Sequence, residues 1–144
     1  MATSTNATTL AAMWKQMCSL SPNSSTTDIQ QITSFFSPTA IVYLNGMGQP
    51  PCTSHAELIA ATQTLISYWA MVEHKNVTHV EQEGGKIIVN AMDNKLKIMG
   101  ELVEGFRECE VVTFDGEGKI ERYELYVDPS PIMAIFAKSK VTKS

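Results

Sequence analysis

The sequence predicts a single α+β domain in which helices come first and a strongly curved antiparallel sheet follows. The helical patterns and one short strand occupy the first half of the chain, and long segments rich in β-branched and aromatic residues fill the second half. Grouped helices followed by grouped strands are typical of α+β domains. A chain of 144 residues has the length of one domain. We expect one unit spanning 1–144, with frayed tails at about 1–7 and 138–144.

Three helices are expected from apolar spacing and capping residues. An amphipathic stripe capped by Thr8 or Thr9 predicts the first, with Leu10, Met13, Trp14 and Met17 at helical spacing. Thr27 or Asp28 caps a second, short helix that ends before Pro38. The third begins at Thr53 or Ser54, where Glu57 completes a capping box, and ends near Met71.

The strands are expected between clear turn signals. They are predicted at 40–44, 72–81, 87–99 with a kink at 93–94, 101–114 and 119–127. A closing helical turn at 132–136 is expected to dock on the core. Long twisted strands around packed helices would form a cone with an open mouth, a shape suited to a ligand.

The last two strands, joined by residues 115–118, suggest a pocket. Gly118 favours a three-residue loop with a glycine bulge, which pairs Phe114 with Ile120 and Val112 with Arg122. That register collects one largely apolar face, made of Val111, Tyr123, Cys109, Leu125 and Val127, with Arg107 and Glu101 on it. An apolar concave face with a few polar groups is typical of a small-molecule pocket. The alternative is that Arg107 lies at the sheet edge and pairs with a neighbouring glutamate.

Two features affect which face of these strands is assigned to the pocket. A slip of one residue would exchange the two faces, and Gly105 could carry a bulge that changes the parity of the residues before it. In the predicted register, Glu108 and Glu110 lie on the opposite face. We assign them, with most other glutamates of the strands, to a solvated surface.

Composition and charge exclude several classes of protein. The net charge of −4, without a basic stripe, argues against nucleic-acid binding, and no apolar run approaches membrane-spanning length. The N-terminus lacks the features of a signal peptide, so we expect a cytoplasmic protein whose three cysteines are reduced thiols. No His, Cys or Asp spacing suggests a metal, and no glycine-rich loop suggests a nucleotide, so no cofactor is expected.

Four short phrases, in this order and spacing, resemble the SnoaL-like branch of the NTF2-like superfamily. They are Phe35-Phe36-Ser37-Pro38-Thr39-Ala40, residues 46–54, Gly116-Glu117-Gly118-Lys119-Ile120 and Tyr126-Val127-Asp128. The resemblance covers about residues 9–131 and implies an α+β cone with a deep pocket, often paired as a homodimer through the sheet. Its members include cyclases, isomerases, epoxide hydrolases, dehydratases and binding domains, so fold alone does not decide function.

One departure from the family argues against epoxide hydrolysis. Where the epoxide hydrolases carry an aspartate just before the terminal aromatic-x-aspartate phrase, this sequence has Leu125. Their arginine-x-aspartate pair corresponds to Arg107-Glu108-Cys109, in which Cys109 replaces the acid.

The resemblance favours a cofactor-independent isomerase or cyclase of secondary-metabolite biosynthesis, similar to small fungal enzymes of polyketide and meroterpenoid pathways. Such an enzyme would rearrange a hydrophobic polycyclic polyketide or terpenoid intermediate by acid–base chemistry. The candidate catalytic residues are Glu101 and Asp128 as bases, Tyr43 as a hydrogen-bond donor, Arg107 as an anion holder, and His79. The candidate substrate-binding residues are Tyr123, Leu125 and Trp69.

The histidines are assigned by strand parity. His74 and His79 face opposite sides of a regular strand, so at most one enters the pocket, and parity with Val77 favours His79. The alternative for each is a surface position or a satisfied site within the sheet. Two other functions remain open: a non-catalytic binding or dimerisation module, and a dehydratase, which would need a histidine within hydrogen-bond reach of a carboxylate.

Overall fold

The computed structural model describes residues 4–141, and the ends of both expected tails lie outside this range. The helices are α1 (Thr5–Ser19), α2 (Thr26–Thr33), α3 (His55–Ile66) and α4 (Ser130–Val141). The strands are β1 (Phe36–Asn45), β2 (Trp69–Glu73), β3 (Asn76–Gln82), β4 (Ile87–Ile98), β5 (Glu101–Phe114) and β6 (Ile120–Val127), with a short 3-10 helix η1 (Glu83–Gly85). The predicted α+β class is confirmed.

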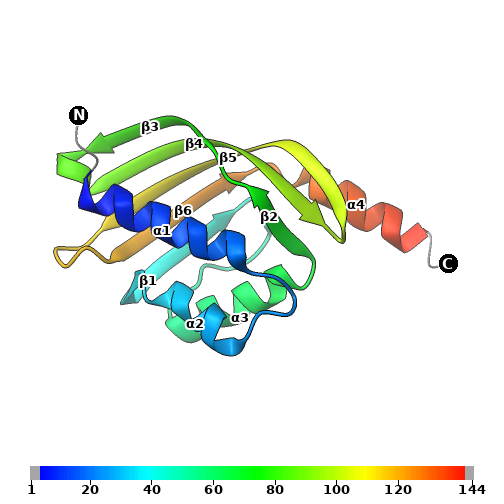
Figure 1. The fold of residues 1–144 in the computed structure, drawn as a ribbon, viewed down its shortest axis with the longest axis horizontal. Helices are drawn as coiled ribbons and strands as arrows, with labels where there is room; N and C mark the ends of the chain where they lie inside the picture. Colours follow the sequence, from blue (N-terminus) through cyan, green and yellow to red (C-terminus); the bar gives the residue numbers. More distant parts are fainter. Residues whose placement is uncertain (1–3, 142–144) are drawn as a thin grey trace.

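All six strands form one open, curved sheet in the order β1-β6-β5-β4-β2, with β3 also paired to β4. The β1–β6 pair is parallel and the other pairs are antiparallel, so the expected all-antiparallel sheet is wrong at this edge. Helices α1, α2 and α3 lie on one side of the sheet, and α4 extends from its end (Figure 1). The core therefore lies between the three N-terminal helices and the sheet face that curves around them.

Serine caps set the start of the N-terminal helices. The Ser4 hydroxyl accepts the Ala7 N–H, so α1 begins earlier than the expected Thr8 or Thr9 cap, and residues 5–7 are helical rather than frayed. Ser25 and Asp28 form a reciprocal capping box for α2. The expected cap at Ser54 is confirmed for α3. At the other end of the chain, residues 130–141 form a full helix instead of a closing turn.

The segment after α3 differs from its prediction. Helix α3 ends at Ile66, and Trp69 and Met71 belong to β2, where they alternate inward with period two. The expected single strand 72–81 is two strands, because the chain leaves β2 at Glu73 and re-enters the sheet at Asn76. Both pair with the continuous strand β4, which passes 93–94 without ending. The parity argument for the histidines fails because no regular strand connects them.

The predicted register of β5 and β6 is wrong by one residue. Phe114 pairs with Ile120 as expected, but Thr113 then pairs with Arg122, so Glu121 is an extra residue on β6. This β-bulge shifts the register of every pair beyond it. Tyr123 consequently lies opposite Val112. The inward face of β5 therefore carries Phe106, Glu108, Glu110 and Val112 in place of Arg107, Cys109 and Val111.

The β-bulge considered at Gly105 is present in the structure. Asn94 pairs with Phe106 and Leu96 pairs with Val103, so two residues of β5 stand opposite one residue of β4. Gly105 has φ +65°, a conformation in which glycine avoids the steric cost of a side chain. Phe106 is buried on one side of the bulge, and Glu104 within it is exposed. Within residues 4–141, no helix is long and apolar enough to span a membrane.

Candidate functional site

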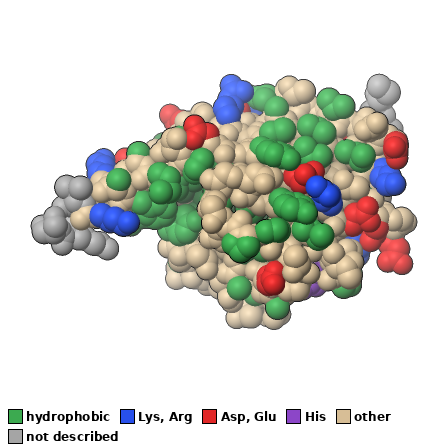
Figure 2. Space-filling model, turned by 180° about the vertical axis from the view of Figure 1, so that it is seen from behind, with side chains coloured by type: hydrophobic (Ala, Val, Ile, Leu, Met, Phe, Trp, Pro, Cys, Tyr) green, Lys and Arg blue, Asp and Glu red, His purple; other side chains and the backbone are tan. Residues whose placement is uncertain are grey.

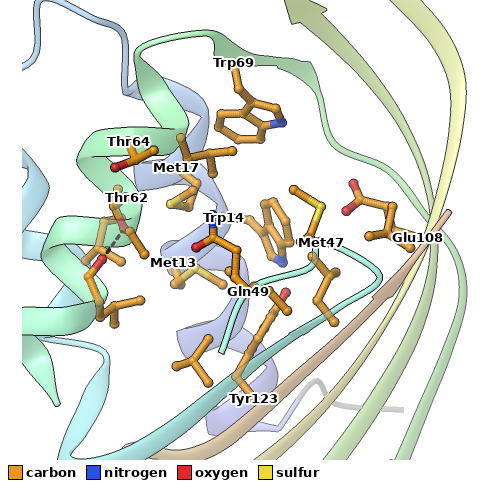
Figure 3. A pocket seen from close by; sticks show the side chains of 18 of the residues that line it. Met13, Trp14, Met17, Met47, Gln49, Thr62, Thr64, Trp69, Glu108 and Tyr123 are labelled. Atoms are coloured by element: carbon orange, nitrogen blue, oxygen red, sulfur yellow. Dashed lines mark hydrogen bonds between the residues drawn. The ribbon is translucent and has the colours of Figure 1, made fainter. Parts of the chain in front are cut away.

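A cavity of about 130 Å³ lies between the N-terminal helices and the concave face of the sheet. Apolar side chains from α1, α3 and the sheet form most of its wall, among them Met13, Trp14 and Met17 of α1, Leu58, Ala61 and Leu65 of α3, and Val42, Leu44, Phe106, Leu125 and Val127 of the sheet. Polar groups are few. Figure 3 shows the Glu108 side chain reaching into this space from the side opposite α1 and α3. The cavity has the apolar wall and sparse polar groups of a small-molecule site.

Glu108 is the acidic residue of this cavity. Its Oε1 accepts a hydrogen bond of 2.8 Å from Asn94 Nδ2, and no other hydrogen bond to the carboxyl group occurs among the described residues. Burial raises its pKa from 4.5 to about 7, and the charge of neighbouring Glu110 also raises it, while the Asn94 donor lowers it. Near neutral pH this carboxyl group therefore exists in both protonation states, as a group that removes and returns protons must.

Glu110 lies next to Glu108 on the same face but is fully buried and does not line the cavity. Its Oε1 accepts hydrogen bonds from Trp14 Nε1 at 2.9 Å and from the Tyr123 hydroxyl at 2.8 Å. Its Oε2 accepts one of 2.8 Å from Asn90 Nδ2. Burial raises the pKa of Glu110, and the three donors oppose that shift. This carboxyl group ties α1 to β4 and β6.

Few other polar groups face the cavity. The Thr62 hydroxyl already donates to the Leu58 carbonyl. Trp69 is buried in the cavity wall, and its indole N–H donates to no other group in residues 4–141. Tyr68 and Gln49 also line the cavity, and burial raises the pKa of the Tyr68 hydroxyl. Trp69, Tyr68 and Gln49 thus provide potential hydrogen-bond donors to a ligand oxygen.

His74 and His79 each contact an asparagine of β4 that in turn donates to one of these glutamates. His74 Nδ1 lies 3.1 Å from Asn94 Oδ1, and His79 Nδ1 lies 2.6 Å from Asn90 Oδ1. The His74 ring also stacks on Trp14, with centroids 4.2 Å apart and planes 9° apart. Neither histidine lines the cavity, which agrees with the expectation that at most one would enter it, but the preference for His79 as that residue is wrong.

None of the five expected catalytic residues lines the cavity. Glu101 is 49% exposed and pairs with Lys138 at 3.5 Å. Arg107 is 69% exposed and lies 3.6 Å from Asp93. This agrees with the alternative of a surface ion pair, although the partner is an aspartate and not a glutamate. The Asp128 carboxylate accepts hydrogen bonds from Ser130 at the start of α4, which lower its pKa. Tyr43 lies under Arg122, with the guanidinium carbon 5.0 Å from the ring centroid.

The placements of Arg107 and Glu101 have different physical reasons. The bulge at Glu121 shifts the register so that Arg107 points outward. Glu101 lies opposite the buried Ile98, but it is the first residue of β5 and is exposed beside Lys138 of α4. The fifth residue, His79, contacts Asn90, which in turn donates to Glu110, and it lies 3.4 Å from Glu81. The expected substrate-binding residues Tyr123, Leu125 and Trp69 all line the cavity.

Glu108 and Glu110 were assigned to a solvated surface, yet one faces the cavity and the other is buried. The sequence of β4 nevertheless indicates that they face the interior. Its inward positions are apolar except at Asn90 and Asn94. A buried amide requires polar partners, so two asparagines in an apolar stripe indicate acceptors on the neighbouring strand. Glu108 and Glu110 are those acceptors.

Comparison with solved structures identifies the fold. No protein-family profile and no curated protein matches the sequence. An NTF2-like protein of unknown function from Burkholderia pseudomallei superposes with a TM-score of 0.71 at 15% identity, covering 92% of this chain and 97% of that one. A protein designated a SnoaL-like polyketide cyclase from Shewanella putrefaciens gives 0.70 at 8% identity, covering 92% and 86%.

A third neighbour is the epoxide hydrolase/cyclase-like enzyme SalBIII, which has a role in pyran ring formation in the polyether salinomycin. It gives a TM-score of 0.65 at 12% identity, covering 85% of this chain and 89% of that one. The chain therefore has the NTF2-like fold of SnoaL-like proteins, as the sequence resemblance implied. At these identities the likeness concerns the fold, and function must be argued from the site.

Proposed function

We propose that this protein is a cofactor-independent isomerase or cyclase that uses Glu108 as its acid–base group. The observation that supports the proposal is a carboxyl group with a pKa of about 7 in the wall of an apolar cavity. A carboxyl group tuned by burial to the working pH both accepts and donates a proton efficiently. Glu108 takes the role first assigned to Glu101 and Asp128.

The proposed reaction moves a proton within one substrate. The ionised Glu108 removes a proton from a carbon next to a carbonyl group, and the electron pair of that C–H bond forms an enolate. The protonated Glu108 then returns the proton to another atom of the conjugated system, so substrate and product have the same mass. Trp69, Tyr68 or Gln49 would donate a hydrogen bond to the enolate oxygen, and the apolar wall would keep water from the enolate.

The size and chemistry of the cavity bear on the substrate class. A cavity of about 130 Å³ accommodates one ring, since an engineered apolar cavity of about 150 Å³ binds benzene. We propose that the reacting ring of a polyketide or terpenoid intermediate enters, while the remaining skeleton lies at the mouth near Met47 and the exposed Gln49. The SnoaL-like and cyclase-like structural neighbours support the polyketide class.

Incubation with candidate pathway intermediates, followed by mass spectrometry, tests the proposal. A product of unchanged mass that forms with the wild type and with Glu101→Gln, but at least about 100-fold more slowly with Glu108→Gln, is the expected result. The two variants make the same chemical change, at an exposed and at a cavity position. Unimpaired turnover in Glu108→Gln would refute the assignment of the base.

Two other outcomes point to the alternative functions. Loss of water from the substrate would indicate a dehydratase. The geometry favours this less, because Asn94 lies between His74 and Glu108. A ligand that co-purifies unchanged and is never converted would indicate a binding module.

We also propose that the protein forms a homodimer through the outer face of the sheet. Large apolar side chains of the strands are exposed there or at the sheet edge, namely Val72, Val77, Val80, Leu102 and Tyr126, each at least 44%. Figure 2 shows apolar side chains gathered on the side of the molecule away from the N-terminal helices. Apolar patches of this kind mark protein interfaces. Light scattering after size-exclusion chromatography tests this, and a monomer at micromolar concentration would refute it.

A further inference from the structure

Two parallel series of side chains cross the sheet from β5 through β4 to the histidines. In the first, Glu108 accepts from Asn94, which lies 3.1 Å from His74 Nδ1. In the second, Glu110 accepts from Asn90, which lies 2.6 Å from His79 Nδ1. The order of residue types is the same in both: glutamate, asparagine, histidine. The series differ in one respect, since only the first ends at a carboxyl group that lines the cavity.

The hydrogen bonds around Asn94 fix which way its amide group points. Asn94 is 1% exposed, so its partners are protein groups. The backbone N–H of Lys75 donates to Asn94 Oδ1 over 3.2 Å, which identifies that atom as the oxygen. The amide nitrogen therefore faces Glu108 and donates to it. A reversed amide would place its oxygen against the Glu108 carboxylate and its NH₂ against the Lys75 N–H donor.

The same pattern fixes the protonation of His74. Because Asn94 Oδ1 only accepts hydrogen bonds, the His74 Nδ1 must carry a proton. Burial lowers the pKa of His74, which favours the neutral ring with Nε2 unprotonated. Stacking on Trp14 holds the ring plane. The other titratable groups of the groove that His74 lines are Lys15 and Cys18 of α1 and His79 of β3.

We propose that His74 is a positioning residue that, through Asn94, fixes the direction of the Glu108 carboxyl group in the cavity. With Oε1 held by Asn94, Oε2 is the atom left for a ligand. His74 does not touch the cavity and transfers no proton in this scheme. Its catalytic consequence rests on the proposed function, because positioning alters turnover only if Glu108 is the base. The positioning itself is measurable without a substrate.

The series that ends at His79 provides a matched control. Glu110 has three donors, so its position does not depend on one asparagine. His79→Phe and His74→Phe each remove the ring N–H at the histidine end of their own series. A difference between the two variants in the pKa of Glu108 therefore reports the direct path through Asn94.

The experiment is a ¹³C NMR titration of the Glu108 carboxyl group, assigned by its loss in Glu108→Gln. Removing the His74 N–H loosens Asn94, and a weaker donor stabilises the carboxylate less. We expect the Glu108 pKa to rise by about 0.5 in His74→Phe, since the Lys75 amide still holds Asn94, and by about 1 in Asn94→Leu. His79→Phe should leave it unchanged. His74→Asn, whose amide nitrogen takes the place of Nδ1, should restore the wild-type value.

Equal shifts in His74→Phe and His79→Phe, or none in His74→Phe, would overturn the proposal. If His74→Phe does not fold, ¹⁵N NMR of the wild-type imidazoles decides, because the proposal requires the Nδ1–H tautomer of His74. An Nε2–H tautomer would refute it. With a substrate in hand, the acidic limb of the kcat/KM pH profile should shift with the NMR value. Full turnover by Glu108→Gln would refute the proposed function without changing the NMR result.

Discussion

Replacing Glu108 by glutamine is predicted to stabilise the protein, by an amount that grows with pH. The folded-state pKa of about 7 stands against 4.5 for the ordinary group, so the folded protein binds this proton more tightly than the unfolded chain. The stability that Glu108 contributes is complete below about pH 4.5 and is lost as pH rises through about 7. The difference between the two pKa values corresponds to about 3 kcal/mol of unfolding free energy.

Glutamine matches the neutral form of the side chain and keeps an oxygen for Asn94 Nδ2. The free energy of unfolding, measured with urea across pH 4.5 to 8.5, should therefore be similar in wild type and Glu108→Gln at the acidic end. At the basic end the variant should be more stable by about 3 kcal/mol. Glu110 is present in both proteins and largely cancels. Glu101→Gln, at an exposed position, should stay within about 0.5 kcal/mol of wild type throughout.

A difference that does not change with pH would refute this reasoning, since it would mean that Glu108 titrates alike in the folded and unfolded protein. A variant less stable than wild type at pH 8 would refute it too. The expected gain in stability with a loss of turnover is the behaviour of a group whose charge is unfavourable for folding and required for chemistry.

Three further substitutions test other parts of the site. Tyr123→Phe removes a donor from the buried Glu110 and should lower the unfolding free energy by about 1–3 kcal/mol in urea denaturation. Arg107→Ala removes an exposed ion pair with Asp93, so unfolding free energy should change by less than about 1 kcal/mol and turnover should persist; a large loss of turnover would contradict the site. Leu125→Trp should fill the cavity and abolish binding of an apolar fluorescent probe, and unchanged affinity would show that the probe binds elsewhere.

Much of the fold could be predicted from local sequence signals, which the structure confirms. The stripe of Leu10, Met13 and Trp14 is buried as its spacing predicts, and Ser54 caps α3. These signals are local because a cap or a helical stripe depends on residues within one or two turns. The edge pairing of β1 with β6 has no such local signal, because the chain crosses the whole domain between them.

The site was predictable only in part, because a single residue decides which face of β5 is inside. A hairpin turn specifies the first pair, Phe114 and Ile120, and says nothing about Glu121 beyond it. The inward side chains of β6, Tyr123 and Leu125, were assigned correctly to the cavity. Their partners on β5 were not, and Glu108 was missed for that reason. The buried asparagines of β4 are the sequence feature that distinguishes the two registers.

Trp14 gives the first helix a role in assembling the site. Its ring lines the cavity and stacks on His74, and its N–H reaches Glu110, 96 residues along the chain. Strand β5 carries both glutamates and pairs with β4 and β6, its neighbours in the sequence, without α1. Docking of α1 covers the face of β5 that carries them. The raised pKa of Glu108, which burial causes, therefore depends on how this helix packs against the sheet.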